Sequence, residues 1–465
     1  MNEEIAEYYE ELYRLYIDEN QPLERRYRQL RESLERVVRE RIQGNSLQTT
    51  DLAARINYVA TQYELDIKEQ NQLHTFRLTS NDILNHRKFP AKEEFLRDLR
   101  AVAFAYRKMF AQDIPLKLFS VLPKQEITSL GKKEKKEYIR RIRVCFDYAD
   151  DTYLYVHPVD IIADEPIRVV YNKPGINHEF EETIKELWRY AQLNLLDVFV
   201  DREGIYTPSF IVLEPDYLID ISSLAECYKD YGSHPANYFL SRLVPIDNAR
   251  PLLLGNIANL FLDEWIHAGE EEPDYIDCMK KAFRQYPIEL AACAELRDPS
   301  KEKEFAKDCR MHFEHIRDIV QHTFLEPGYN LDKKDAVLEP SYICEALGIQ
   351  GRLDYMQRDM SSFIEMKSGK ADEFSIQGKV EPKENNKVQM LLYMAVLEYS
   401  MGQDRRRMHP YLLYTRYPLL YPARASWAQV RRVINLRNRI VAAEYGVQFH
   451  NHSDFTRNLL AQINP

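Results

Sequence analysis

The stretch Ser361-Ser362-Phe363-Ile364-Glu365-Met366-Lys367 has the composition of a buried strand that ends in two charged residues. Side chains alternate along a strand, so Glu365 and Lys367 share one face and the apolar residues beside them face the other way. Ten residues separate Glu365 from the upstream sequence Gly351-Arg352-Leu353-Asp354, which belongs to a second predicted strand. We expect Asp354 to emerge beside Glu365 at the end of this two-stranded unit.

Secondary-structure signals around this unit indicate an α/β layer. Two strands are followed by a helix, a third strand and a second helix, an order in which helices cover a sheet. On the first of these helices Gln389 and Tyr393 are four residues apart and therefore share one face. The predicted strands are Ile349–Met356, Ser362–Lys367 and Tyr411–Thr415, and the predicted helices are Asn386–Tyr399 and Ala425–Tyr445.

Asp354, Glu365 and Lys367 are residue types that phosphodiester hydrolysis requires. Carboxylate oxygens suit hard cations such as Mg²⁺ or Mn²⁺, and such an ion acidifies bound water and polarises a phosphoryl oxygen. Lys367 would orient or deprotonate the water, or offset negative charge in the transition state. Gln389 would donate to the phosphate or hold the water, and Tyr393 would either contact the substrate backbone or pack.

A structural alternative is an exposed hairpin that carries a Glu–Lys pair two residues apart. Glu-x-Lys occurs three times in the chain, beginning at Glu134, Glu365 and Glu381. Glu134 lies in a run of Lys and Glu residues, and Glu381 lies in a polar loop. Glu365 instead follows an apolar strand pattern and precedes the Gln/Tyr helix, which favours the catalytic interpretation.

These motifs resemble those of the PD-(D/E)XK nuclease superfamily, specifically its RecB-like branch. Gly-x-x-Asp, Glu-x-Lys and Gln-x-x-x-Tyr stand in the order and spacing of that branch, and Leu353 replaces the usual proline before the aspartate. The sequence is most similar to the N-terminal nuclease half of flap-processing replication nuclease–helicases. The likeness covers about residues 212–446 and includes Val212–Ile219, Leu254–Ile257 and Val433–Asn438.

The resemblance implies a restriction-endonuclease-like core, a mixed sheet flanked by helices. It implies an Mg²⁺- or Mn²⁺-dependent deoxyribonuclease that cleaves single-stranded DNA, flaps or ends in DNA repair, replication or defence. The backbone carbonyl of Met366 would join Asp354 and Glu365 as a metal ligand. DNA would be held by Lys370, Gln389 and Arg437.

One departure from the family pattern affects the expected metal site. The first nuclease helix of the relatives carries Gly-x-x-x-His, whereas this chain has Gly255-x-x-x-Asn259. An amide is a poorer ligand for a divalent ion than an imidazole. Asn259 would therefore be a weaker ligand than the family's histidine, and Asp263, His312 or His315 would be the substitutes.

The residues ahead of this module divide into a helical and a β-rich region. Residues 1–112 carry apolar positions at helical spacing, which is typical of a helical hairpin or bundle. Residues 113–211 alternate with period two in several short strands, which indicates a small barrel or half-open sheet. We therefore predict an α+β or α/β protein with domains at 1–112, 113–211 and 212–465, the last with a helical insertion at about 262–326.

Composition and charge predict a cytoplasmic chain with a local basic segment. The 465 residues carry a net charge of −10, no apolar run reaches the roughly 18 residues of a membrane span, and the acidic N-terminus lacks a signal peptide. Met401–Pro465 contains ten Lys or Arg and three Asp or Glu. This segment would suit either nucleic acid or solvent, and the basic runs Lys132–Lys136 and Arg140–Arg143 leave the same two interpretations open.

The sequence also predicts that an iron–sulfur cluster and an ATP-binding loop are absent, and it leaves two other functions open. No Cys follows Cys344, so we expect no iron–sulfur cluster of the kind that many relatives hold. No Gly-x-x-x-x-Gly-Lys-Ser/Thr loop is present, so a helicase would act in cis within a longer gene product, or in trans. The asparagine at 259 would also suit a catalytically weak nuclease-like DNA-binding or docking module, and the N-terminal helices would suit a scaffold that recruits a partner.

Overall fold

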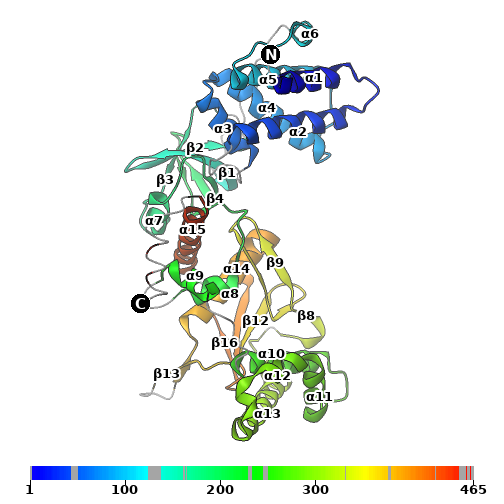
Figure 1. Cartoon of the computed structure of the whole chain (residues 1–465). Coiled ribbons are helices and arrows are strands. Elements are labelled where there is room, and N and C mark those ends of the chain that lie inside the picture. Colours follow the sequence, from blue (N-terminus) through cyan, green and yellow to red (C-terminus); the bar gives the residue numbers. More distant parts are fainter. Residues whose placement is uncertain are drawn as a thin grey trace. The chain divides into compact units, whose positions relative to one another are not determined.

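The protein has a mixed α+β fold, in agreement with the predicted class, and is described by a computed structural model (Figure 1). Its contacts divide the chain into two compact units, residues 1–214 with 445–451 and residues 215–444 with 452–465. The basic run Lys132–Lys136 lies outside the described residues. The structure describes residues 3–42, 51–123, 138–160, 163, 165–228, 233–243, 250–329, 331–374, 379–424, 426–449, 457 and 461.

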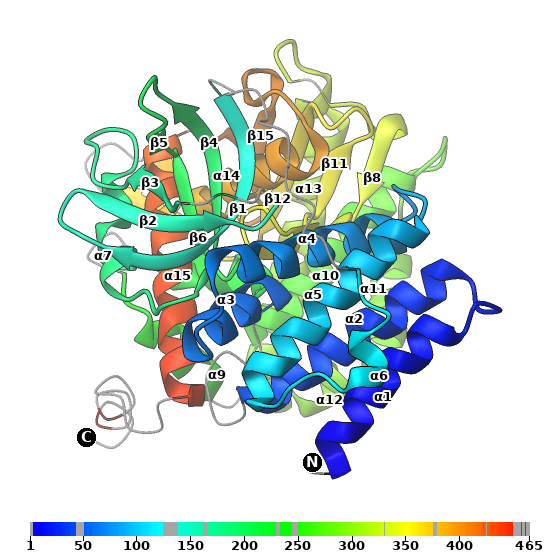
Figure 2. The same ribbon diagram turned by 90° about the horizontal axis from the view of Figure 1, so that it is seen from above.

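The first unit begins with a bundle of helices (Figure 2). The predicted apolar stripe is confirmed, because Tyr27, Leu30, Leu34 and Val37 are fully buried on one helix face. Asp66 begins another helix with a reciprocal cap, in which its carboxylate accepts from the backbone of the third helical residue. The helices are α1 Glu3–Ile17, α2 Leu23–Arg41, α3 Leu52–Gln62, α4 Ile67–Leu84, α5 Lys92–Phe110 and α6 Leu116–Phe119.

The β-rich segment of this unit forms a sheet whose pairings return to the first strand. The strands pair in the circuit β1–β2, β2–β3, β3–β5, β5–β4 and β4–β1, and β6 is attached to β4. Only the short β3–β5 contact is parallel. The elements are β1 Tyr138–Ala149, β2 Tyr153–Pro158, β3 Ile167–Val170, α7 Glu181–Lys185, β4 Gln192–Val200, β5 Tyr206–Thr207 and β6 Phe210–Leu213.

The helical and β-rich segments share one hydrophobic core, although the sequence predicts them as separate domains. Cys145 of β1 and Tyr190 are buried within the same apolar cluster as the helices. Tyr190 also donates to Thr61 Oγ1 over 3.0 Å, and Gln192 donates to Asp51 over 2.9 Å. The sequence could not show this joint core because it depends on contacts between distant residues.

The second unit contains a helical part that begins before the range of about 262–326, over which the sequence predicts a helical insertion. Phe261 and Phe313 pack edge to face with ring centroids 5.3 Å apart, which joins α10 to α13. The first helices are α8 Ile221–Glu226 and α9 Ala236–Leu243. The others are α10 Arg250–His267, α11 Tyr275–Gln285, α12 Pro287–Ala292 and α13 Pro299–Gln321.

The main sheet of the second unit has the strand order β16-β15-β12-β11-β8. Its central pair β12–β15 is parallel and its other pairs are antiparallel. Ile364 and Met366 of β12 are buried in the core with α10 and α13, so the predicted alternation along this strand is confirmed. The elements are β8 Ala336–Leu338, β11 Tyr355–Gln357, β12 Ser362–Lys367, β13 Asp372–Phe374, β14 Lys379–Glu381, α14 Glu384–Met401, β15 His409–Tyr414, β16 Leu419–Pro422 and α15 Trp427–Phe449.

The predicted single strand over Ile349–Met356 is wrong. Residues Ile349–Arg352 form β10, which pairs with β7 Ile219–Asp220 and β9 Ser341–Cys344 in a separate sheet. The chain passes from one sheet to the other at Leu353 and Asp354. There the Leu353 amide donates to the Pro340 carbonyl over 3.1 Å, and the Asp354 carbonyl accepts from the Glu339 amide over 3.1 Å. Asp354 therefore lies at a junction between two sheets.

A helix crosses a membrane only if it is both long and apolar. None of the helices in the described part of the chain is both long and apolar enough to cross a bilayer. The longest, such as α13, are interrupted by charged side chains on their exposed faces.

Candidate active site

Asp354 and Glu365 lie on the same face of adjacent strands. Tyr355 pairs with Ile364 in the antiparallel β11–β12 ladder, so the preceding residue Asp354 stands opposite Glu365. Facing residues of an antiparallel pair have Cβ atoms about 4.5–5.5 Å apart on one side of the sheet. The Asp354 carboxylate also accepts from the Met366 amide over 2.6 Å, which fixes it at the end of β12.

Lys367 and Gln389 complete a bonded cluster around Glu365. The Lys367 ammonium donates to Glu365 Oε1 over 2.9 Å and to the Gln389 side-chain oxygen over 2.8 Å. The Gln389 amide donates to Glu365 Oε1 over 2.6 Å and to Ser222 Oγ over 2.9 Å. The second oxygen of Glu365 is buried and has no hydrogen-bond partner among the described residues.

The two carboxylates are electrostatically unfavourable neighbours. Burial raises the pKa of Asp354 above its usual value, and burial together with the Asp354 charge raises the pKa of Glu365. Burial acts to lower the pKa of Lys367, but the adjacent Glu365 outweighs it and the net shift is upward. One ammonium thus faces the buried carboxylate of Glu365 and the half-buried carboxylate of Asp354, an arrangement that a bound cation would stabilise.

Helix α10 presents Gly255, Asn259 and Asp263 along one face at intervals of four residues. A Cβ at Gly255 would lie 3.2 Å from Ser368 Oγ, so this helix approaches the end of β12 closely. The Asn259 side-chain oxygen is buried and lacks a hydrogen-bond partner among the described residues. Burial raises the pKa of Asp263 to about 6, and the Glu339 and Asp354 charges add to the shift.

The histidines proposed as substitute ligands have other surroundings. His312 is fully buried on α13, and burial lowers its pKa to about 4. The ring of His315 is bonded to the Thr415 carbonyl over 3.0 Å. Asn259 and Asp263 are therefore the better candidates for an additional contact.

Two predicted site residues serve the fold and do not face a substrate. Tyr393 is fully buried and donates to the Arg352 carbonyl over 2.6 Å, so it positions the chain just before Asp354. Arg437 is also fully buried and donates to the carbonyls of Gly348 and Tyr217. The prediction that Arg437 contacts DNA disagrees with this geometry, because its guanidinium is enclosed.

A cavity of about 390 Å³ opens beside Lys367. Its lining includes the exposed Lys370, a predicted DNA contact, and the exposed Lys383. Lys383, Ser222 and the cavity residue Glu226 were not predicted. Lys383 offered a signal, since it belongs to the Glu-x-Lys at 381, whereas Ser222 and Glu226 lie more than a hundred residues upstream with no motif.

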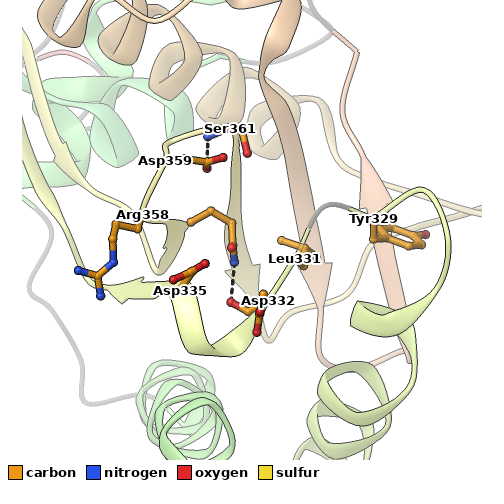
Figure 3. Close-up of a pocket in the computed structure, with 8 residues that line it drawn as sticks. Tyr329, Leu331, Asp332, Asp335, Arg358, Asp359 and Ser361 are labelled. Carbon is orange, nitrogen blue, oxygen red and sulfur yellow. Dashed lines mark hydrogen bonds between the residues drawn. The ribbon is translucent and has the colours of Figure 1, made fainter.

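A second cavity of about 440 Å³ lies at the opposite ends of β11 and β12 (Figure 3). There the Gln357 side chain donates to the Asp332 carbonyl over 2.9 Å, and Asp359 accepts from the Ser361 amide. These polar groups are hydrogen-bonded within the loops and the strand end that carry them. The candidate residues Asp354, Glu365 and Lys367 lie at the other end of these strands.

The atoms at this site that are able to bind a metal ion are mainly oxygens, which hard divalent ions prefer. Among the described residues, no three His, Cys, Asp or Glu side chains form a cluster able to hold a metal ion. Asp354 and Glu365 supply two carboxylates, and Glu365 and Asn259 each keep a buried oxygen without a partner. This oxygen-rich set fits Mg²⁺ or Mn²⁺ if backbone carbonyl or water ligands complete it.

Comparison with known proteins adds no relative. No protein-family model matches the chain, and the curated proteins contain no significant match to it.

The raised pKa of Asp354 makes a prediction about stability. Between the usual carboxyl pKa of roughly 4 and the raised value, the folded protein holds more protons than the unfolded chain, so stability falls as pH rises. Asp354→Asn should therefore raise the melting temperature in EDTA at pH 8 by about 2–4 °C. The gain should shrink as pH is lowered toward 5, as measured by differential scanning fluorimetry.

The exposed Asp335→Asn serves as the control and should leave the melting temperature unchanged. Excess Mn²⁺ should raise the melting temperature of the native protein more than it raises that of the Asp354→Asn variant. The reason is that a ligand stabilises the state that binds it. A lower melting temperature for Asp354→Asn in EDTA at pH 8 would show that the carboxylate is not strained there.

The enclosed Arg437 makes a second prediction. Arg437→Lys should lower the free energy of unfolding by about 2–3 kcal/mol, because one ammonium cannot replace both guanidinium bonds to carbonyls. Urea unfolding measures the change, and Arg432→Lys on the exposed side of α15 is the matched control. Native stability of Arg437→Lys combined with lost DNA binding would instead support the original assignment.

Proposed function

We propose that the chain is a metal-dependent deoxyribonuclease that hydrolyses phosphodiester bonds of single-stranded DNA, flaps or ends. The supporting observation is the pair Asp354 and Glu365 on facing strands, with Lys367 bonded to Glu365 and one carboxylate oxygen left without a partner. The proposal includes the finer fold, a PD-(D/E)XK core of the RecB-like branch. The mixed order of the main sheet and the α14 helix that supplies Gln389 support it.

The metal ion would be held by Asp354, Glu365 and the Met366 carbonyl, with Asn259 or Asp263 as a further contact. A divalent ion at such a site acidifies water and polarises the phosphoryl oxygen. The buried like charges of the two carboxylates favour binding of a cation over the metal-free state. No iron–sulfur cluster is part of the proposal.

Lys367 would act on the attacking water or on the charge that builds on the phosphate. Gln389 holds the ammonium and the Glu365 carboxylate in one arrangement, so Gln389 is a positioning residue. Lys370 and Lys383 at the cavity would neutralise substrate phosphates, since ammonium groups bind them as point charges. The same site would serve repair, replication or defence, with a helicase in cis or in trans.

A second candidate function is a nuclease-like DNA-binding or docking module with little activity. The observation that favours it is the amide of Asn259 at the place of the family's histidine, together with only two carboxylates facing each other. This alternative predicts DNA affinity that falls with salt and no products with Mn²⁺ even at high protein concentration.

Substitution of Lys367 tests the catalytic proposal. Lys367→Ala should reduce cleavage of end-labelled single-stranded DNA by at least about 100-fold, because the group that assists the chemical step is lost. Cleavage by the native chain should require Mn²⁺ or Mg²⁺ and stop in EDTA. Gel analysis of the products measures both effects.

The control is Lys334→Ala, which removes an exposed lysine from the other end of the sheet. It should cleave like the native chain, and circular dichroism should show that both variants fold. Native-like cleavage by Lys367→Ala would exclude Lys367 from the mechanism, and absence of Mn²⁺-dependent products from the native chain would favour the docking module.

Asn259 tests the composition of the metal site. Asn259→His should bind Mn²⁺ about 10-fold more tightly, because imidazole is the better ligand and the Asn259 oxygen is buried without a partner. Isothermal titration with Mn²⁺ measures the affinity. Asn256→His on another face of α10 is the control, and equal affinity of all three proteins would remove position 259 from the ligand set.

A further inference from the structure

The first unit carries a row of aromatic side chains on the outer face of β1, β2 and β3. Tyr148 pairs with Tyr155, and Tyr155 pairs with Arg168, so these three side chains stand in one row across the strands. Their neighbours Leu154 and Val169 are fully buried on the inner face. The row therefore points away from the interior of the sheet.

Two of the rings on this face are stacked on each other, and a third ring lies edge-on to them. Tyr148 and Tyr155 stack with centroids 4.2 Å apart and planes 13° apart, and Tyr148 is 50 % exposed. Tyr153 lies edge-on to Tyr155 at 6.5 Å, and the Arg168 guanidinium lies 5.6 Å from the Tyr153 ring centroid. The three rings and the guanidinium are thus neighbours on this face, and the group is here called the tyrosine platform.

Hydrogen bonds at the β1–β2 turn fix the tyrosine platform. The Tyr155 hydroxyl donates to the Asp150 carboxylate over 3.0 Å, and the same carboxylate accepts from the amides of Thr152 and Tyr153. The Tyr171 hydroxyl donates to the Asp150 carbonyl over 2.8 Å. A surface whose rings are held in advance loses little freedom when a ligand stacks on it.

The order of strand pairing relates this face to a known ligand-binding surface. The circuit β1-β2-β3-β5-β4-β1 is that of an OB-type sheet, in which the face of strands 2 and 3 and the loop between strands 1 and 2 bind oligonucleotides. The tyrosine platform occupies that face and ends at that loop. We propose that it binds single-stranded nucleic acid by stacking unpaired bases on Tyr148, Tyr153 and Tyr155, with Arg168 beside a base or phosphate.

The charges around the platform indicate what dominates the binding. Asp147 precedes Tyr148 in β1 and pairs with Arg189 over 2.9 Å, and the Asp150 carboxylate accepts from the Tyr155 hydroxyl. The platform therefore has little surplus positive charge for phosphates. Stacking on aromatic rings accepts every base, so binding should be insensitive to sequence, should discriminate against duplexes and should depend weakly on salt.

The experiment is fluorescence anisotropy of the full chain with a fluorescein-labelled 20-nucleotide oligo(dT) in EDTA, where the proposed cleavage is silent. Tyr148→Ala should weaken binding about 10-fold, since one stacked base is lost. Tyr148→Trp should restore the affinity because it restores the stacking surface. Phe199→Ala, which removes a 57 % exposed ring elsewhere on the same sheet, is the matched control and should bind like the native chain.

Several results would overturn the proposal. They are an unchanged affinity of Tyr148→Ala, an equal loss in Phe199→Ala, failure of Tyr148→Trp to restore binding, equal affinity for a duplex, or capture of an oligosaccharide in place of oligo(dT). The outcome is separable from the proposed nuclease function. If oligo(dT) binding depends on Tyr148 and no Mn²⁺-dependent products form, the platform proposal stands and the nuclease proposal fails. If the chain cleaves DNA and Tyr148→Ala does not change binding, the nuclease proposal stands and the platform proposal fails.

Discussion

The repulsion between two carboxylates held on facing strands is the constraint on which the second unit depends. Asp354 and Glu365 cannot move apart, because Tyr355 and Ile364 pair in the ladder beside them and the alternate residues of β12 are buried in the core. A shift of one residue would exchange the two faces of β12 and turn Glu365 into the apolar core that now holds Ile364 and Met366. The sheet therefore holds the two carboxyl groups side by side, and the pKa of each is raised above its usual value.

Local patterns predicted the elements that carry this site. The alternation in Ser362–Lys367 and the helical spacing of Gln389 and Tyr393 depend on near neighbours, and both are found in the structure. The change of sheet at Leu353 was missed because it depends on hydrogen bonds to Pro340 and Glu339. Motif likeness also misled at Arg437, since a motif gives residue identity and not burial.

The two proposals assign different interactions with a nucleic acid to two surfaces of the chain. Beside Lys367, the exposed Lys370 and Lys383 offer charge to phosphates. The tyrosine platform offers flat rings to bases and has carboxylates close by. Under the proposed function, the first surface would hold the backbone near the scissile bond, and the second would select strands whose bases are unpaired.

The most direct test is the position of Mn²⁺ in crystals of the native chain, located by anomalous diffraction. If these two residues bind the metal, a peak lies about 2.0–2.6 Å from carboxylate oxygens of both Asp354 and Glu365. Saturating Mn²⁺ with no peak between these two residues, or with a peak bound by other side chains, would show that they do not form the metal site.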